Sequence, residues 1–263
     1  MNKIKIFQVD AFANKRFEGN PAAVCLLSYW ISDEIMQNIA AENNLAETAF
    51  VVPGDNHFEI RWFTPALEVD LCGHATLAAA YIIFEHLKYK EDILKFHSLR
   101  SGALNVVKED EIFYLDFPKD TLIPESNNKR IEGSIGVLPE YVFKGKTDYL
   151  AVLKTENELQ NIIPNLELIA GLDARGLIVT APGREVDFVS RFFAPQSGID
   201  EDPVTGSAHT TLIPYWSNKL QKKELKARQI SGRGGNLICK DKGERVIIGG
   251  KAKLYLSGEI YIN

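Results

Sequence analysis

The feature that most constrains this chain is an internal repeat with a period near 130 residues. The segment RWFTP at Arg61–Pro65 recurs 130 positions later as RFFAP at Arg191–Pro195. Further along, GHA at Gly73–Ala75 recurs 133 positions later as GSA at Gly206–Ala208. Solenoid repeats have periods of about 20 to 50 residues, so this period is too long for one. The ordered matches are hard to reconcile with coincidence and predict two similar domains, each with a strand, a Phe-x-Pro turn, a glycine and a buried helix.

The length of the chain agrees with two domains. It has 263 residues, of which 45% are apolar and 25% charged, and this is ordinary globular composition. The polar, proline-containing stretch KDTLIPESNNK at 119–129 is the best candidate for a linker. We therefore expect an N-terminal half over 1–118 and a C-terminal half over 119–263, with the final strand able to pack back on the first half.

Charge and cysteine content exclude several classes of protein. Thirty Lys and Arg against 35 Asp and Glu give a net charge of −5, which disfavours a protein that coats nucleic acid or an anionic membrane. The longest apolar run, Ala75–Phe84, is shorter than a membrane span. Three sparse cysteines without CxxC spacing predict neither a disulfide framework nor a zinc site. With no signal-peptide pattern at the start, we expect a cytoplasmic protein.

Periodicity predicts a mixture of strands and helices. Ser32–Asn44 has a capping serine, acidic residues in its first turn and an apolar stripe, which is typical of a helix. Ala75–Leu87 is apolar almost all round, which marks a buried helix. Further helices are expected over 156–162 and 208–220. Strands are expected over 3–12, 48–52, 58–63, 103–107, 112–117, 149–153, 176–181, 186–193, 230–239 and 244–248.

Each half of the repeat places a glycine directly before a buried helix. Cys72 and Gly73 precede one helix, and Thr205 and Gly206 precede the other. A helix N-terminus carries unpaired N–H groups and a partial positive charge, and glycine lets a ligand approach the backbone closely. In an acidic protein, two such helix starts predict a local binding site for a small anion such as a carboxylate.

Longer motifs make the sequence recognisable. They are GNPAAV at 19–24, LAETAFV at 45–51, RWFTPALEVDLCGHATLAAA at 61–80 and RFFAPQSGIDEDPVTGSAH at 191–209. The chain resembles the phenazine-biosynthesis isomerase (PhzF-like) family, which has the diaminopimelate-epimerase-like fold. The resemblance runs over nearly the whole chain. It implies an α+β protein of two pseudo-symmetric domains, each a curved, mostly antiparallel sheet around a central helix, with the active site in the cleft between them.

The resemblance also implies roles for individual residues. Glu47 takes the place of the family's acid/base glutamate, which moves a proton between carbon atoms of a small carboxylate-bearing substrate. Neutral His74 and Asp202 would act with it, the aspartate binding a polar substrate group or orienting the histidine. The family is cofactor-independent and usually homodimeric. The implied substrate-binding residues are Asn20, Gly73, Gly206 and Ser207.

Two alternatives stay open. Epimerases of this fold use two opposed cysteines, and Cys72 lies where one is expected, but its repeat partner 133 positions later is Thr205. A two-thiol racemase is therefore incomplete here, and a small buried residue is the simpler interpretation of Cys72. The other alternative is a non-catalytic binding module. The five histidines lack metal-ligand spacing and there is no complete nucleotide-binding motif, so we predict no metal and no cofactor.

Overall fold

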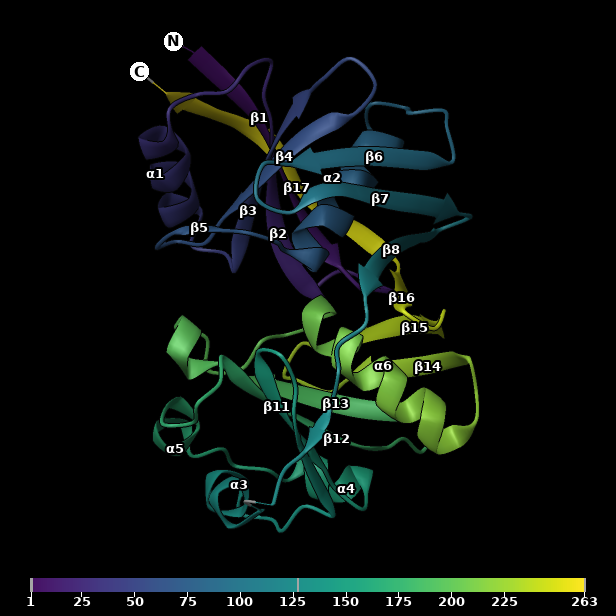
Figure 1. Ribbon diagram of the computed structural model, residues 1–263. Helices are drawn as coiled ribbons and strands as arrows, with labels where there is room; N and C mark the ends of the chain where they lie inside the picture. Colours follow the sequence, from purple (N-terminus) through teal and green to yellow (C-terminus); the bar gives the residue numbers. More distant parts are fainter. Residues whose placement is uncertain (1, 127, 263) are drawn as a thin grey trace. The chain divides into compact units, whose positions relative to one another are not determined.

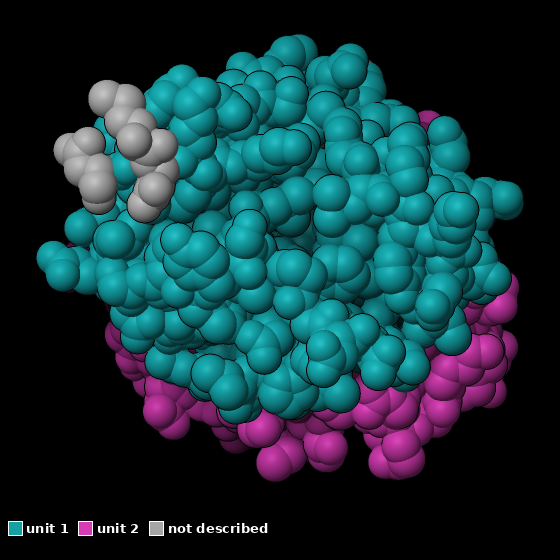
Figure 2. Space-filling view, turned by 90° about the horizontal axis from the view of Figure 1, so that it is seen from above, with its two compact units in different colours: residues 1–116, 249–263 teal, residues 117–248 magenta. Residues whose placement is uncertain are grey.

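The computed structural model describes residues 2–126 and 128–262 and shows a sheet-rich α+β protein (Figure 1). The chain forms two compact units, residues 1–116 with 249–263 and residues 117–248 (Figure 2). The last 15 residues of the chain, 249–263, group with the first unit, and the expected division after residue 118 stays a prediction. No described helix is long and apolar enough to cross a membrane.

The first unit holds two helices and a mixed sheet. β1 pairs antiparallel with both β17 and β2, β2 runs parallel to β3, and β3 pairs antiparallel with β4. β6, β7 and β8 follow as antiparallel neighbours. The elements are β1 (Asn2–Ala11), β2 (Asn20–Leu26), α1 (Asp33–Asn43), β3 (Glu47–Pro53), β4 (Phe58–Phe63), β5 (Glu68–Val69), α2 (Gly73–Glu85), β6 (Ile93–Ser98), β7 (Gly102–Glu109), β8 (Ile112–Pro118) and β17 (Ala252–Ile262).

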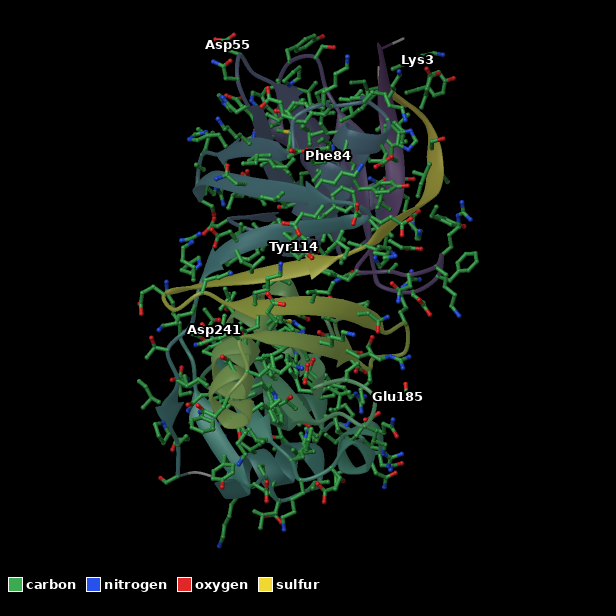
Figure 3. All side chains as sticks on the ribbon, turned by 90° about the vertical axis from the view of Figure 1, so that its right-hand side faces the viewer. Lys3, Asp55, Phe84, Tyr114, Glu185 and Asp241 are labelled. Atoms are coloured by element: carbon green, nitrogen blue, oxygen red, sulfur yellow. The ribbon has the colours of Figure 1, made fainter. Side chains whose placement is uncertain are left out.

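Helix α2 is the core element of this unit. Its sequence GHATLAAAYIIFE is apolar on every side, and ten of its residues are buried. It packs against β1, β2, β3 and β17. Near its C-terminal end the ring of Phe84 lies 5.6 Å from Tyr89 and 5.9 Å from Phe113. Phe84 is labelled among the side chains in Figure 3. A helix this apolar is stable only when covered on all sides, so the sheet must wrap it.

The second unit has a similar order of antiparallel and parallel strand pairs, and it has more helices. β10 and β11 are antiparallel, β11 runs parallel to β12, β12 pairs antiparallel with β13, and β13 runs parallel to β14. Helix α6 packs against β14 and β15 (Figure 1). The elements are β9 (Ile123–Pro124), α3 (Asn128–Ile135), β10 (Tyr141–Lys144), β11 (Asp148–Val152), α4 (Glu156–Gln160), α5 (Leu166–Ala170), β12 (Gly176–Pro182), β13 (Phe188–Phe193), η1 (Pro195–Ser197), α6 (Gly206–Leu220), β14 (Glu224–Gln229), β15 (Gly235–Asp241) and β16 (Arg245–Gly250).

The sequence repeat corresponds to the same local structure in both units. Arg61 on β4 bonds Glu68 through two nitrogens and lies over the ring of Phe63 at 5.1 Å. Arg191 on β13 bonds Glu201 in the same way and lies over Phe193 at 4.9 Å. A bidentate pair fixes the guanidinium plane, so each arginine holds the turn that follows its strand.

Most of the predicted elements are confirmed. Helix α1 begins after the capping Ser32 and ends at Asn44, whose backbone is left-handed, as the pattern predicts. Two expectations were wrong. The proposed linker contains β9, which pairs with β10, and the strand expected over 230–239 begins only at Gly235. Strands β2, β6, β10 and β14 and helices α3 and α5 were missed.

Candidate active site

Glu47 is placed by the junction of α1 and β3. The left-handed Asn44 ends the helix, and three residues later Glu47 opens β3 beside Ala22 of the parallel strand β2. Its side chain is 14% exposed. An acid at a strand end, with one side toward solvent and one toward the protein, can exchange protons with a bound molecule.

His74 contacts the carboxylate of Glu47 from the side of the protein interior. It is the second residue of α2 and is buried, and its Nε2 lies 3.0 Å from Oε2 of Glu47. Its Nδ1 lies 3.2 Å from the side-chain amide of Asn20, the fully buried first residue of β2. Asn20 therefore fixes the orientation of the imidazole.

Cys72 completes the cluster. It is the N-cap residue of α2 with extended backbone, and its Sγ lies 3.5 Å from Nδ1 and 3.9 Å from Nε2 of His74. One ligand-type atom from each of Glu47, Cys72 and His74 lies within 4.8 Å of the other two. The thiol therefore lies nearer Nδ1 of the imidazole, whereas the carboxylate faces Nε2.

Burial and charge set the protonation of this cluster. Burial raises the pKa of the Cys72 thiol, with a further contribution from the Glu47 charge. Burial alone would lower the pKa of His74, but the charges of Cys72 and Glu47 outweigh it and raise the pKa well above its usual value. The carboxylate of Glu47 thus favours a proton on His74, and the neutral imidazole that the resemblance implies stays a prediction.

Asp202 lies in the second unit, where it helps to hold the start of α6. Its carboxylate accepts a hydrogen bond from the hydroxyl of Thr205, the N-cap residue. The buried Gln229 donates to the backbone carbonyl of Asp202 and accepts from the backbone N–H of Thr205. Thr205 thus replaces, with a hydroxyl, the thiol that Cys72 carries at the repeat position.

Ser207, in the second unit, contacts the side chain of Arg175. Its hydroxyl accepts from Arg175 at 3.0 Å, and Arg175 also bonds the buried Asp148 through two nitrogens. Asp148 raises the pKa of Arg175 against the effect of burial, so the guanidinium is charged. The site prediction omitted Arg175, although the weak match of 174–176 to 46–48 aligns it with Glu47 at an offset of 128.

The two glycines begin helices whose N-cap residues make no side-chain capping hydrogen bond: Cys72 precedes Gly73, and Thr205 precedes Gly206. The caps of α1, α4 and α5 do make one. A backbone hydrogen bond from Ala75 nevertheless reaches the Cys72 sulfur at the start of α2. An anion site at these helix starts stays a prediction.

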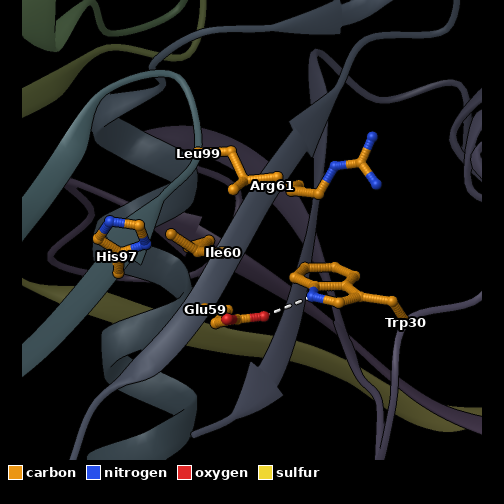
Figure 4. Close-up of a pocket in the computed structure, with 6 residues that line it drawn as sticks. All are labelled: Trp30, Glu59, Ile60, Arg61, His97 and Leu99. Atoms are coloured by element: carbon orange, nitrogen blue, oxygen red, sulfur yellow. Dashed lines mark hydrogen bonds between the residues drawn. The ribbon is translucent and has the colours of Figure 1, made fainter.

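A surface pocket in the first unit contains none of these residues. It is lined by Trp30, Glu59, Ile60, Arg61, His97 and Leu99 (Figure 4). Two of its polar side chains already have hydrogen-bond partners in the protein. The Trp30 indole donates to Glu59, and Arg61 donates to Glu68. The cluster around Glu47 is therefore the stronger candidate for chemistry.

Fold and cluster together define a class of protein: a two-unit α+β enzyme with a half-buried carboxylate–imidazole pair at the start of a core helix. The family model for phenazine biosynthesis-like proteins (PhzC-PhzF) matches residues 9–258. The chain belongs to this family.

Individual relatives support the same assignment. An uncharacterized isomerase of Pseudomonas aeruginosa is 47% identical over 99% of this chain and 100% of its own length. The human phenazine biosynthesis-like domain-containing protein is 40% identical, with 98% of this chain and 99% of its own length covered. The crystal structure of a PhzF-family protein from Enterococcus faecalis superposes with a TM-score of 0.95 at 47% identity, over 99% of this chain and 100% of its own.

More distant structures share the fold alone. A hydroxyproline epimerase from Agrobacterium vitis superposes with a TM-score of 0.62 at 9% identity, with 98% of this chain and 92% of its own covered. The expected α+β, epimerase-like fold is therefore confirmed. The three bacterial relatives at 45 to 49% identity are all named isomerases, and isomerase is the enzyme class of this chain.

Proposed function

We propose that the protein is a cofactor-independent isomerase that moves a proton between carbon atoms of a small carboxylate-bearing metabolite. Glu47 is the general acid/base. The observation that supports this most is the 3.0 Å contact between the half-buried Glu47 carboxylate and the buried His74. A carboxylate held in one orientation at the edge of an apolar core is a suitable base for a C–H proton.

The geometry suggests how the steps divide among residues. The Glu47 carboxylate takes a proton from substrate carbon, and the electron pair left behind is delocalised into the adjacent conjugated system. Glu47 then returns the proton to a different carbon. His74, oriented by Asn20, keeps the carboxylate in place. The same carboxylate serves both steps, so no cofactor is required.

The helix starts supply binding for the substrate carboxylate. We propose that backbone N–H groups at Gly73, Gly206 and Ser207 hold its negative charge, and that Asp202 binds a polar substituent. The charged Arg175 beside Ser207 favours an anion at the start of α6.

Solvent-deuterium exchange tests the proposal directly. A panel of cyclic and linear amino and hydroxy acids is incubated with the protein in heavy water, and C–H signals are followed by proton NMR. Deuterium incorporation together with appearance of a positional isomer supports the isomerase. Binding of a panel member without exchange would favour a non-catalytic binding module on the same fold.

A racemase that uses Cys72 is the second candidate, because the thiol lies 3.5 Å from Nδ1 of His74. Its raised pKa, however, makes the thiol a proton donor rather than a base. A racemase would invert the substrate's stereocentre without changing its connectivity. Chiral chromatography of the same reactions separates these two outcomes.

We also propose that the protein acts as a homodimer in the cytoplasm on a biosynthetic intermediate, without nucleic-acid or membrane partners. These are family expectations. Sedimentation equilibrium tests the dimer, and fractionation of the source cell tests the location.

A further inference from the structure

A fully buried glutamine lies beside Asp202 and has no step in the proposed reaction. Gln229 is the last residue of β14, and its side chain is shielded from solvent. Removing a side-chain amide from water costs free energy unless protein groups replace the lost hydrogen bonds. An apolar side chain of similar size would fill the same space without that cost. The partners of Gln229 therefore indicate what the amide does.

Those partners fix the direction of each hydrogen bond. Oε1 of Gln229 accepts from the backbone N–H of Thr205 at 2.9 Å, and Nε2 donates to the backbone carbonyl of Asp202 at 2.7 Å. A backbone N–H can only donate and a carbonyl can only accept, so the amide has one possible orientation. Nε2 also donates to the hydroxyl oxygen of Thr205 at 3.1 Å. The single hydrogen of that hydroxyl is left to donate to the carboxylate of Asp202.

A third residue holds Thr205 in place. Nδ1 of His209, one turn further along α6, donates to the carbonyl oxygen of Thr205 at 2.8 Å. The N–H, the carbonyl and the hydroxyl of Thr205 thus all bond to buried residues. A fully bonded buried network has one low-energy arrangement, so the Asp202 carboxylate takes its orientation from Thr205.

The corresponding position of the first unit carries a shorter side chain. β6 pairs parallel with β4, and β14 pairs parallel with β13. In these registers β13 lies 130 positions after β4 and β14 lies 131 positions after β6, so Ser98, the last residue of β6, corresponds to Gln229. The Ser98 hydroxyl accepts from the backbone N–H of Arg100 in its own turn. The longer amide therefore occurs in the unit that carries Asp202.

We propose that Gln229 and Thr205 are positioning residues that hold the Asp202 carboxylate in one orientation for the substrate. Gln229 orients the hydroxyl of Thr205, and this hydroxyl orients the carboxylate. Both residues act through Asp202. The positioning half of this inference stands on hydrogen bonds within the second unit. The substrate half rests on the proposed function, in which Asp202 binds a polar substituent of the substrate.

NMR scalar couplings test the positioning half without any substrate. Three-bond couplings from the side-chain carboxyl carbon of Asp202 to its own backbone nitrogen and carbonyl carbon report the χ1 rotamer. We expect a single rotamer in the wild type and in Thr205→Ser, which keeps the hydroxyl. Thr205→Val has nearly the same shape but no hydroxyl, so Asp202 should average over several rotamers. Gln229→Met removes the amide at similar size, and Gln229→Asn shortens its reach by one methylene; both should have the same effect.

Thr180→Val is the matched control. Thr180 is a buried threonine of the second unit whose hydroxyl donates to the carbonyl of Val189 and accepts from the indole of Trp216. The variant also loses a buried, hydrogen-bonded hydroxyl, so its melting temperature should fall while Asp202 keeps a single rotamer. A single Asp202 rotamer in Thr205→Val, or in whichever Gln229 variant folds, would overturn the proposal.

The substrate half is read from the kinetics of solvent exchange. A contact made equally to the bound substrate and the transition state affects KM and leaves kcat unchanged. KM should therefore rise by about 10-fold or more in Thr205→Val with kcat nearly constant, and Thr205→Ser and Thr180→Val should keep the wild-type KM. In an Asp202→Asn background, Thr205→Val should raise KM no further, because both changes act on one contact.

The combined results separate the two halves. Averaged Asp202 rotamers with an unchanged KM would show that the network is real and that Asp202 does not bind the substrate. A raised KM with a single Asp202 rotamer would reject positioning of the carboxylate. Absence of exchange with every compound of the panel would count against the proposed function, and the rotamers alone would then decide the positioning half.

Discussion

At the residue scale, the chemistry of the first unit comes from a few contacts between a strand end and a helix start. Glu47 and His74 are 3.0 Å apart, and Asn20 and Cys72 lie against the other ring nitrogen of the histidine. Each group limits what the others can do. Burial and the charge of Glu47 raise the pKa of the Cys72 thiol, and the charges of Cys72 and Glu47 raise the pKa of His74.

Glu47→Gln is expected to lower turnover and solvent exchange by ~10⁴-fold or more. A positioned acid/base group contributes about 10² to 10⁴-fold, and Glu47 serves both half-reactions. The amide oxygen still accepts from His74, so substrate affinity and melting temperature should change little. The control is Glu42→Gln, an exposed glutamate of α1. Wild-type exchange in the Glu47 variant would remove this residue from the mechanism.

Cys72→Ser is expected to keep turnover within about tenfold of wild type, because hydroxyl and thiol are nearly the same size and the sulfur takes no part in proton transfer. Steady-state kinetics on the substrate found by exchange measure the effect. A loss beyond about a thousandfold in a folded variant would instead support the racemase.

His209 should make the protein sensitive to mild acid. Its Nδ1 donates to the carbonyl of Thr205, and burial lowers its pKa from 6.5 to about 4. At pH values between about 4 and about 6.5, His209 is protonated in the unfolded chain but neutral in the folded chain. The free energy of unfolding therefore falls as the pH falls through this range. Over this whole pH range, the loss in free energy of unfolding caused by His209 is at most about 3 kcal/mol.

Denaturant unfolding at a series of pH values measures this contribution. His209→Gln should reduce the slope of unfolding free energy against pH in that window, by up to about 1.4 kcal/mol per pH unit. His97→Gln, an exposed histidine, should leave the slope unchanged. Equal slopes for wild type and His209→Gln would mean that the buried imidazole does not set acid stability.

At the scale of elements, turns determine where the site residues lie. Gly19, between β1 and β2, has φ +71°, and a Cβ there would lie 2.1 Å from the carbonyl oxygen of Ala11. It directly precedes Asn20, which holds His74. The helix α6 shows a comparable adjustment. Pro214 removes an N–H inside the helix, and the backbone N–H of Asp120 donates to the freed carbonyl of Thr210.

Gly19→Ala should therefore reduce both stability and activity. Left-handed backbone costs a residue with a Cβ about 1–2 kcal/mol, and the overlap with Ala11 adds to this and displaces Asn20. Gly243→Ala is the matched control, since φ is +83° and nothing lies within 4 Å of the added carbon. Thermal melts and solvent exchange should show a larger loss of both at Gly19. Equal losses of stability, with exchange retained in Gly19→Ala, would show that this turn does not position the histidine.

At the scale of the whole molecule, the chain returns to its first unit at the end. Residues 249–263 belong with 1–116, and β17 pairs along the full length of β1. Deletion of residues 251–263 should thus unfold the first unit while the second keeps its core. Tryptophan indole N–H signals report this in proton–nitrogen NMR spectra: Trp30 and Trp62 lie in the first unit and Trp216 in the second.

The indole of Trp216 donates to the hydroxyl of Thr180, so its shifted signal should survive the deletion. The signals of Trp30 and Trp62 should collapse to unfolded positions. Removal of only residues 261–263 is the control and should preserve all three signals. A deletion protein with native signals for Trp62 would show that β17 is dispensable.

The sequence by itself determined the features that depend on near neighbours. The cap and stop residues bounded α1, the unbroken apolar run predicted the buried α2, and the repeat predicted two related units with uncapped helix starts. Even strands β6 and β14, which were missed, carry a clear alternation of exposed and buried residues. Local patterns determine these features because helix capping and side-chain periodicity act over a few residues.

Only the tertiary structure decided what meets across long separations. It brought Cys72 and His74 to Glu47, returned β17 to β1, and joined Arg175 to Asp148. The sequence around one residue of such a contact does not predict which distant residue it will meet. These long-range contacts form because α2 and α6 can be buried only if the sheets wrap around them. The wrapping then places the strand ends that carry the contacting residues.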